Sequence, residues 1–360
     1  MNLGIGDATR PLFPCVVEKI HECVRLLSDE KTFKGYPPVN GYDFFKSAVS
    51  RKYARWGVNV NTDDVFVSDG AKSDIFALLH VFGKITAMIK NPTYPAYLDA
   101  NLAFGNEILF LYSDKANGFL PSPYDLENDK KDVGALIYIC SPDNPTGATY
   151  DKKGLTEWVK HANRTGSVIV FDGAYSDYVT GNRPRSIFQI DGAEECAIEI
   201  SSLSKSANFT GVRLGWTIIG ERLERKGVKL KKVFSRMKAS MTNGVSYLSQ
   251  YAGAEALSDV GLKRIAENVN YYKENALTLK AFFDEIGVFA SGAENSPYVF
   301  FECPNKMKSF DCFDFLLNDV GVIATPGFGY NTGGENFMRL SGFCSRNVAL
   351  KAVERLSTVF

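Results

Sequence analysis

Runs of apolar residues recur along the first two thirds of the chain, and polar residues follow each run abruptly. Residues 134–140, 167–171 and 195–200 form three such runs. Strands that are buried on both faces of a parallel sheet have this near-continuous apolar character. Because these strands alternate with helical patterns between about residues 40 and 240, the sequence predicts a parallel sheet covered by helices on both faces.

The last third of the chain follows a pattern in which helices predominate. A helical pattern extends from Val245 to about Ile286, and another begins at about Asn347. Between them, the apolar residues 298–302 predict a strand, and near the N-terminus residues 15–27 predict one more helix. A short strand among long helices indicates a smaller α+β unit, against which we expect the N-terminal segment to pack.

These patterns predict two domains, one of them discontinuous. We expect a large domain over residues 31–250 and a small domain formed by residues 1–30 together with residues 251–360. No low-complexity linker or internal repeat separates them. A chain of 360 residues is long enough for one large domain or two smaller ones.

Charge and composition are typical of a metabolic enzyme in the cytoplasm. The 41 basic residues balance the 41 acidic ones, so no electrostatic footprint for nucleic acid or an anionic membrane is present. No apolar stretch reaches the roughly 18 residues of a membrane span, and the first residues do not resemble a signal peptide. Seven cysteines without paired spacing favour a reducing compartment, and three histidines offer little material for a metal site. We therefore expect no metal, no nucleic acid and no membrane partner.

Polar residues with complementary chemistry follow the three buried strands. Asn144 follows the first, Asp172 and Tyr175 follow the second, and Lys205 follows the third, between Ser204 and a further serine. Open α/β sheets bind ligands at the carboxyl ends of their strands. An amine bonds an aldehyde, a carboxylate holds a ring nitrogen protonated, and an amide and a phenol bind a ring oxygen. Taken alone, the lysine also fits an ordinary solvating charge.

A turn between a strand and a helix offers a site for a phosphate. Residues 64–67 predict a strand, residues 68–72 its turn and residues 73–82 a helix. A turn of small residues that opens a helix leaves backbone N–H groups free for an anion, although a plain connection has the same pattern. The side chains of Ser202, Ser204 and Arg213 would add donors to the same phosphate.

At this point the motifs match a known family. The chain resembles the fold-type I, pyridoxal-phosphate-dependent aminotransferases of class I/II, and among them it is most similar to the LL-diaminopimelate aminotransferases. The resemblance extends almost from end to end, and Asn144-Pro-Thr-Gly147, Ser204-Lys205 and Arg213-Leu-Gly-Trp216 in this order are its most specific elements. The first and last of these elements lie within the matching segments 140–147 and 211–216, and the other matching segments are residues 2–7, 35–36, 68–74, 91–97, 172–175, 326–329 and 337–341. The resemblance implies a large domain with a mostly parallel seven-stranded sheet, covered by helices, and a smaller α+β domain.

The resemblance also implies a role for individual residues. Lys205, Asp172 and Tyr175 are the expected catalytic residues, with Lys205 bonded to the cofactor, pyridoxal 5'-phosphate. The expected cofactor contacts are Ala71, Lys72, Tyr94, Asn144, Asp172, Tyr175, Ser202, Ser204, Lys205, Arg213 and Tyr36, the last from the partner subunit of a homodimer. The expected substrate contacts are Gly6, Tyr36, Asn144, Asn243 and Arg339.

Three of these residues have ordinary structural alternatives. Arg339 is the expected clamp on the substrate α-carboxylate, but an isolated arginine also fits a surface ion pair. Tyr94, expected to stack on the cofactor ring, also fits a core aromatic residue. Asn243, expected to reach across the dimer interface, also fits a helix N-cap.

Two departures bear on the substrate. Relatives carry about thirty residues before the segment that begins at Asn2, and they carry an acidic residue where Val39 stands. That acid is expected to meet the distal ammonium of diaminopimelate, which is costly to bury without a partner. Either another acid such as Glu294 takes this role or the substrate differs; Glu294 also fits a solvated loop charge.

The sequence therefore favours an aminotransferase that acts on LL-diaminopimelate with 2-oxoglutarate. The same fold and cofactor also serve aminotransferases for aspartate, alanine or aromatic amino acids, and β-lyases. A ligand-sensing effector domain of a transcription factor is a non-catalytic alternative, and it would need a DNA-binding module, for which we see no room before Asn2.

Overall fold

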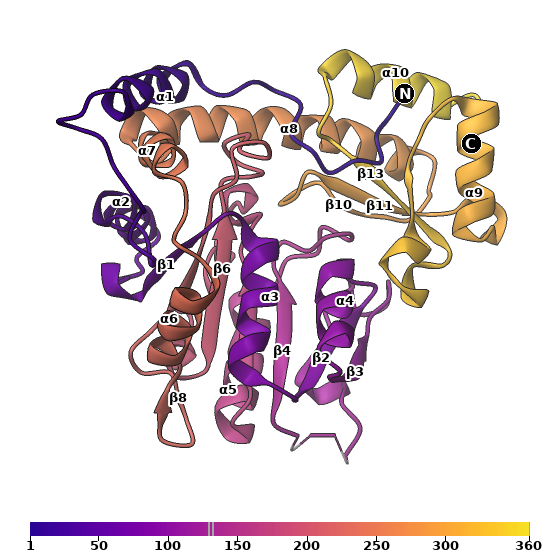
Figure 1. Ribbon diagram of the computed structural model, residues 1–360. Coiled ribbons are helices and arrows are strands. Elements are labelled where there is room, and N and C mark those ends of the chain that lie inside the picture. The colour runs from indigo at the N-terminus through magenta and orange to yellow at the C-terminus, as the bar shows by residue number, and fades with distance from the viewer. Residues whose placement is uncertain (129, 132, 360) are drawn as a thin grey trace.

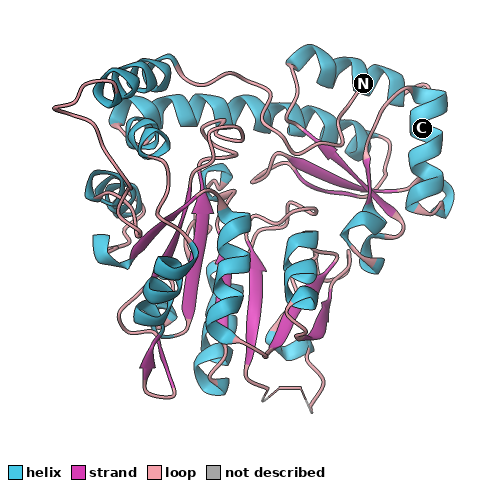
Figure 2. Cartoon of the chain, in the orientation of Figure 1, coloured by secondary structure: helices cyan, strands magenta, loops and turns pink. Residues whose placement is uncertain are grey.

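The chain folds around two β-sheets of different size, with helices packed on their faces (Figures 1 and 2). The computed structural model describes residues 1–128, 130–131 and 133–359. The first helix, α1 (Pro14–Leu27), matches the helix predicted over residues 15–27. It begins at a proline, whose missing N–H would have no partner in the first turn of a helix anyway.

The large sheet has seven strands in the order β1-β7-β6-β5-β4-β2-β3. Strands β2 to β6 run parallel, and β7 is antiparallel to both of its neighbours. This confirms the predicted, mostly parallel sheet. Its strands are β1 (Val65–Ser68), β2 (Thr86–Asn91), β3 (Glu107–Tyr112), β4 (Ala135–Cys140), β5 (Val168–Asp172), β6 (Ala197–Ser202) and β7 (Gly215–Ile219).

Helices cover both faces of this sheet, which explains why its strands are mostly apolar. In β4, Leu136 and Tyr138 face one core, and Ile137 and Ile139 face another. Because side chains alternate between the faces of a strand, both sets must be apolar. The helices around the sheet are α2 (Asp43–Ala54), α3 (Ala71–Phe82), α4 (Pro95–Ala103), α5 (Lys152–Thr165) and α6 (Leu230–Met241). A short hairpin of β8 (Glu224–Arg225) and β9 (Val228–Lys229) precedes α6.

The parallel register brings the carboxyl ends of three strands to one edge of the sheet. Cys140 at the end of β4 pairs with Asp172 at the end of β5, and Asp172 pairs with Ile200 of β6. The polar residues that follow these strands therefore lie side by side, as the sequence predicts.

The small sheet is antiparallel and has the order β10-β11-β13-β12. The first residues of the chain join this unit, because Asn2 forms a bridge with Ile323 and Leu3 is buried in the small core. Phe13 and Val16, at the start of α1, are instead buried in the core of the large sheet. Its strands and helices are β10 (Ala290–Gly292), β11 (Tyr298–Glu302), β12 (Thr325–Pro326), β13 (Phe337–Ser341), α9 (Ser309–Phe315) and α10 (Arg346–Leu356). Strand β11 has the predicted bounds.

The helical region predicted from Val245 to Ile286 is two helices, α7 (Tyr247–Ala256) and α8 (Asp259–Glu285). The break comes at Ser258, whose hydroxyl accepts a hydrogen bond of 3.1 Å from the Gly261 N–H and so caps α8. Figure 1 shows α8 extending from the large unit to the small one.

Helix α8 takes part in both cores. Its first half places Ile265 and Val269 in the core of the large sheet, and its second half places Leu279 and Phe283 in the core of the small one. We therefore retain the domain division at residue 250 as a proposal, with α8 as the shared element. Within the described residues, no helix is long and apolar enough to span a membrane.

Glu199 of β6 is a fully buried carboxylic acid in the large sheet. The Tyr53 hydroxyl donates to one oxygen at 2.6 Å, while the Ser186 hydroxyl and the Ile187 N–H donate to the other at 2.5 and 3.1 Å. Burial raises the pKa of Glu199 to about 7, and these three donors offset only part of that cost.

Replacement of Glu199 by Gln should flatten the dependence of stability on pH. The folded pKa of about 7 lies above the unfolded value of 4.5, so the stabilisation by the protonated group is complete below pH 4.5 and is lost as the pH rises through 7. Each group of this kind contributes a slope of at most about 1.4 kcal/mol per pH unit. Urea unfolding between pH 5 and 8 measures this slope. The matched control is Glu18→Gln at an exposed position; equal slopes for E199Q and the parent protein would contradict the assignment.

Candidate active site

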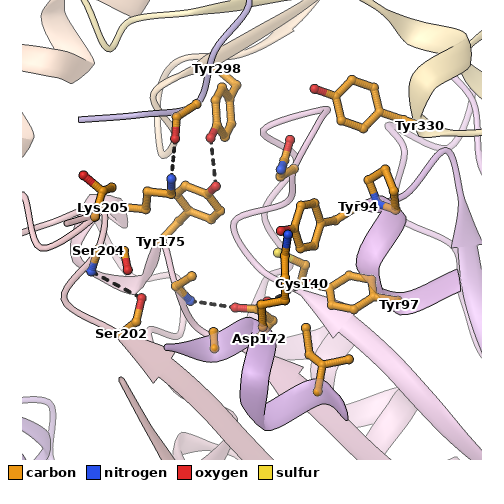
Figure 3. Close-up of a pocket in the computed structure, with 18 of the residues that line it drawn as sticks. Tyr94, Tyr97, Cys140, Asp172, Tyr175, Ser202, Ser204, Lys205, Tyr298 and Tyr330 are labelled. Atoms are coloured by element: carbon orange, nitrogen blue, oxygen red, sulfur yellow. Dashed lines mark hydrogen bonds between the residues drawn. The ribbon is translucent and has the colours of Figure 1, made fainter. Parts of the chain in front are cut away.

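A cavity of about 540 Å³ lies where the two sheets meet. The ends of β4, β5 and β6 and the start of α3 line one side of it, and the small sheet contributes Tyr298 and Arg339. Figure 3 shows Asp172, Tyr175, Lys205 and Tyr298 around this space. The cavity is thus at the edge of the sheet where the sequence predicts a ligand.

Most of the residues that the sequence singles out line this cavity. They are Gly6, Ala71, Lys72, Tyr94, Asn144, Asp172, Tyr175, Ser202, Ser204, Lys205, Arg213 and Arg339. Tyr36 and Asn243 do not line it within a single chain. Tyr36 is 85% exposed, and Asn243 is exposed in the bend between α6 and α7. The alternative role of Asn243 as a helix cap is wrong, because Ser246 caps α7.

The cavity also contains residues to which the sequence analysis gave no role. These are Ile75, Pro95, Tyr97, Cys140, Ala174, Thr210, Tyr298, Thr325, Gly329 and Tyr330. Tyr97 and Cys140 lie within the matching segments 91–97 and 140–147, so their position in these segments could have identified them as site residues. Tyr298 lies in an apolar strand of the small sheet, and no local pattern distinguishes it from a core residue.

One end of the cavity is built for an anion. The backbone N–H groups of Ala71 and Lys72 are at the first turn of α3, where the helix has free donors and a positive dipole end. This helix begins at Ala71, two residues before the predicted start. Gly70 has a φ of 138°, which residues with a Cβ atom rarely adopt, and a Cβ atom there would lie 2.3 Å from Nη2 of Arg213. Glycine therefore suits this turn beside the guanidinium. Together with Ser202 and Ser204, these groups suit a phosphate.

Asp172 is a buried carboxylate at the floor of the cavity. The Tyr97 hydroxyl donates to Oδ2 at 2.7 Å, and the Ala174 N–H donates to Oδ1 at 2.9 Å. Burial raises the pKa of Asp172, which these two donors and the more distant Lys205 partly counteract. A cationic ring nitrogen in the cavity would stabilise the charged form of this carboxylate.

Lys205 follows β6 and directs its amine into the same space. Its Nζ donates a hydrogen bond to the carbonyl of Gly6, in the N-terminal segment. Burial lowers the pKa of Lys205 to about 8; Asp7 opposes this shift, and the nearby Arg339, Arg213 and Lys72 add to it. A lowered pKa increases the neutral fraction of the amine, which is the form that acts as a nucleophile or base.

Arg339 of β13 brings a buried guanidinium to the opposite side. Nη1 donates to Oδ1 of Asn144 at 2.7 Å, and Nη2 donates to the Gly4 carbonyl at 2.5 Å. Its Nε is buried and has no hydrogen-bond partner among the described residues. The surface ion pair considered from the sequence is therefore wrong, and the unsatisfied donor suits the carboxylate of a ligand.

These groups fit pyridoxal phosphate as a set. The cavity combines an anion cradle, a buried carboxylate without a hydrogen-bonded cation, a lysine with a lowered pKa and an unsatisfied arginine N–H. These match the phosphate, the ring nitrogen and the aldehyde of the cofactor, and a substrate carboxylate. Among the described residues, no cluster of histidine, cysteine or acidic side chains suitable for a metal ion was found.

A buried ion pair holds the loop that carries Asn144. Nζ of Lys90, in β2, lies 2.6 Å from Oδ2 of Asp143, and both side chains are almost completely buried. The same carboxylate oxygen accepts from the hydroxyl and the N–H of Thr146 at 2.6 and 3.1 Å. Because Asn144 lies between Asp143 and Thr146, these contacts fix its position opposite Arg339.

Comparison with known proteins gives consistent matches over the whole chain. The family model for aminotransferase class I and II matches residues 1–356. The LL-diaminopimelate aminotransferase of Agathobacter rectalis is 37% identical over 374 aligned residues, which cover 100% of this chain and 91% of the relative. The enzyme of the same name from Lachnospira eligens is 38% identical over 370 residues, with the same shares. The solved structure of L,L-diaminopimelate aminotransferase from Chlamydomonas reinhardtii matches with a TM-score of 0.93 and 34% identity. The match covers 100% of this chain and 90% of the Chlamydomonas chain.

Replacement of Lys90 by Met should lower the free energy of unfolding by about 3–5 kcal/mol, because it leaves the Asp143 carboxylate buried without its cation. The double variant K90M/D143N removes both charges, so its free energy of unfolding should fall by much less. Urea unfolding measures each value. The control is Lys115→Met, which breaks a 3.0 Å ion pair with Glu302 that is far more exposed and should cost at most about 1 kcal/mol. Additive losses in K90M, D143N and the double variant would show that the pair is not coupled.

Proposed function

The chain belongs to the class I and II aminotransferases, and we propose that it moves an amino group between LL-diaminopimelate and 2-oxoglutarate with the aid of pyridoxal phosphate. The observation that carries this proposal is the convergence of Lys205, Asp172 and Arg339 on one cavity. The identity of 37–38% to LL-diaminopimelate aminotransferases over the whole chain supports the choice of substrate.

Each part of the cofactor has a proposed partner in the chain. Asp172 would hold the ring nitrogen protonated, and Asn144 and Tyr175 would bind the ring oxygen. When bound, pyridoxal phosphate supplies an electron sink for the electrons released at the substrate Cα. Tyr94 would pack against the ring, and Tyr36 of the partner subunit would complete the phosphate site. The remaining phosphate contacts are assigned to Ala71, Lys72, Ser202, Ser204 and Arg213.

Lys205 is the proposed proton carrier. At neutral pH, a pKa of about 8 leaves part of the amine neutral, so Nζ accepts a proton from the substrate Cα and later returns one. Its hydrogen bond to the Gly6 carbonyl indicates how the N-terminal segment restrains the amine between these transfers. The same burial that lowers the pKa also keeps bulk water from competing for the proton.

Arg339 is the proposed clamp on the substrate α-carboxylate. Two of its nitrogens bind Asn144 and the Gly4 carbonyl, which fix the plane of the guanidinium. A fixed plane favours bidentate binding of a carboxylate, since little side-chain entropy is then lost. Gly6 would leave room beside it for the substrate.

A second substrate class remains in the proposal because of Val39. Glu294, the alternative acid, does not line the cavity. Its Oε1 lies 3.6 Å from Nζ of Lys280, and its side chain is 59% exposed. Amino acids without a distal ammonium, such as aspartate, alanine or aromatic residues, need no carboxylate at that point. A β-lyase reaction on the same cofactor is the other alternative.

We also propose a cytoplasmic homodimer in which Tyr36 and Asn243 enter the site of the neighbouring subunit. Both side chains are exposed in the single chain, as contacts to a partner would require. The balanced charge of 41 basic and 41 acidic residues supports small-molecule substrates rather than nucleic acid.

The half-reaction of the cofactor-loaded protein tests the substrate. Mixed with single amino acids, the protein should convert its cofactor to the amino form with LL-diaminopimelate and with glutamate, and this conversion is followed by visible absorbance. Aspartate, alanine, lysine and aromatic amino acids are the comparison set. If one of these converted the cofactor rapidly while diaminopimelate had no effect, the assignment as an aminotransferase would stand and the proposed substrate would be rejected.

Replacement of Lys205 by Ala should slow transamination by at least about 10²-fold, because the proton carrier is lost. The protein should also lose covalent attachment of the cofactor, which intact mass after borohydride reduction measures. Lys160→Ala, at an exposed position of α5, is the control. A K205A protein that transaminates at the parental rate would refute the central assignment.

A further inference from the structure

Tyr298 is a cavity residue without an assigned role. It is the first residue of β11 in the small sheet, and only 1% of its surface is exposed. Its hydroxyl lies 2.8 Å from the hydroxyl of Tyr175, which follows β5 of the large sheet. A hydrogen bond between side chains thus joins the two sheets inside the cavity.

The direction of this hydrogen bond decides what Tyr175 does. Each phenol has one proton, so only one of the two hydroxyls donates to the other. If Tyr175 donated to Tyr298, it would have no proton left for a ligand. If Tyr298 donates, the proton of Tyr175 is free to point at an acceptor in the cavity.

The surroundings of Tyr298 favour it as the donor. The guanidinium carbon of Arg339 lies 4.2 Å from the centre of the Tyr298 ring. Burial raises the pKa of both phenols, that of Tyr175 to well above its ordinary value, and at Tyr298 the positive charge of Arg339 is the largest effect that opposes the rise. The more acidic phenol of a neutral pair is the better hydrogen-bond donor, so the proton of Tyr298 is directed toward Tyr175.

Tyr298 also has little freedom to take another orientation. A Cβ atom at Gly6 would lie 2.4 Å from its hydroxyl oxygen, which shows how closely the N-terminal segment covers it. Its ring packs edge to face against the rings of Tyr175 at 5.4 Å and Phe343 at 6.0 Å. The Tyr298 hydroxyl is therefore held between Gly6, whose carbonyl accepts the hydrogen bond from Lys205, and Tyr175, which faces the ligand.

We propose that Tyr298 is a positioning residue that donates its hydroxyl proton to Tyr175 and so directs the Tyr175 hydroxyl toward the ring oxygen of pyridoxal phosphate. This inference rests on the proposed function, because it requires that cofactor in the cavity. A chain of two donors is stronger than a single one, since each hydrogen bond polarises the next.

The effect is measurable in the pH titration of the loaded protein. A donor at the ring oxygen stabilises the deprotonated form of the loaded site, in which that oxygen carries the full negative charge. Weaker donation by Tyr175 therefore raises the pH midpoint of the visible absorbance band. In the variant Tyr298→Phe, which retains the ring, the midpoint should rise by about 0.5 pH unit.

Coupling to Tyr175 separates this role from a purely structural one. Tyr175→Phe should raise the midpoint by more than Y298F does, and the double variant Y175F/Y298F should match Y175F alone, because the chain of donors is already broken. The matched control is Tyr330→Phe. Tyr330 also lines the cavity, and its ring centre lies 5.2 Å from the Arg339 guanidinium carbon; its loss of a hydroxyl should leave the midpoint unchanged.

A second substitution at the same position tests the sign of the effect. Tyr298→3-fluorotyrosine keeps the shape of the residue and makes its phenol more acidic, so the midpoint should fall. An unchanged midpoint in Y298F, additive shifts in the double variant, or a midpoint that does not fall with the fluorinated residue would overturn the inference. A parent protein that binds pyridoxal phosphate without a titrating band, or does not bind it, would overturn the proposed function as well.

Discussion

The shared helix α8 is the constraint on which the active site depends. Because its two halves are buried in the cores of different sheets, the small sheet has a fixed place above the carboxyl ends of β4, β5 and β6. Two contacts across the cavity rely on that placement: Arg339 with Asn144, and Tyr298 with Tyr175. A change in the angle between the sheets would separate both pairs, so the geometry of the site is a property of the whole fold.

The cavity gathers more positive than negative charge. Lys72, Lys205, Arg213 and Arg339 line it, and Asp172 is the acid among its lining residues. This excess suits a ligand that carries a phosphate and a carboxylate, and it helps to lower the pKa of Lys205. Burial, cationic neighbours and a positive helix end therefore act together: they bind the anions and they keep the lysine reactive near neutral pH.

Local patterns predicted the large sheet well, because strands that are buried on both faces are mostly apolar. The same rule placed the residues at the strand ends, since parallel strands end at one edge. Prediction was weaker where a feature depends on one side chain in space. The cap at Ser258 divides the predicted helix, and Tyr298 looks like any other aromatic residue of a strand, because its partner lies 123 positions away in the sequence.

The sequence by itself determined the fold class, the chemical groups at the strand ends and the family, because these depend on residue types at fixed spacings. Only the tertiary structure decided that Arg339 faces the cavity with Asn144 and an unsatisfied Nε, and that Lys205 is buried enough to have a pKa of about 8. The physical reason is that burial and hydrogen-bond partners arise from packing between distant segments. A linear pattern records which groups are present, and the fold determines how far water is excluded from each of them.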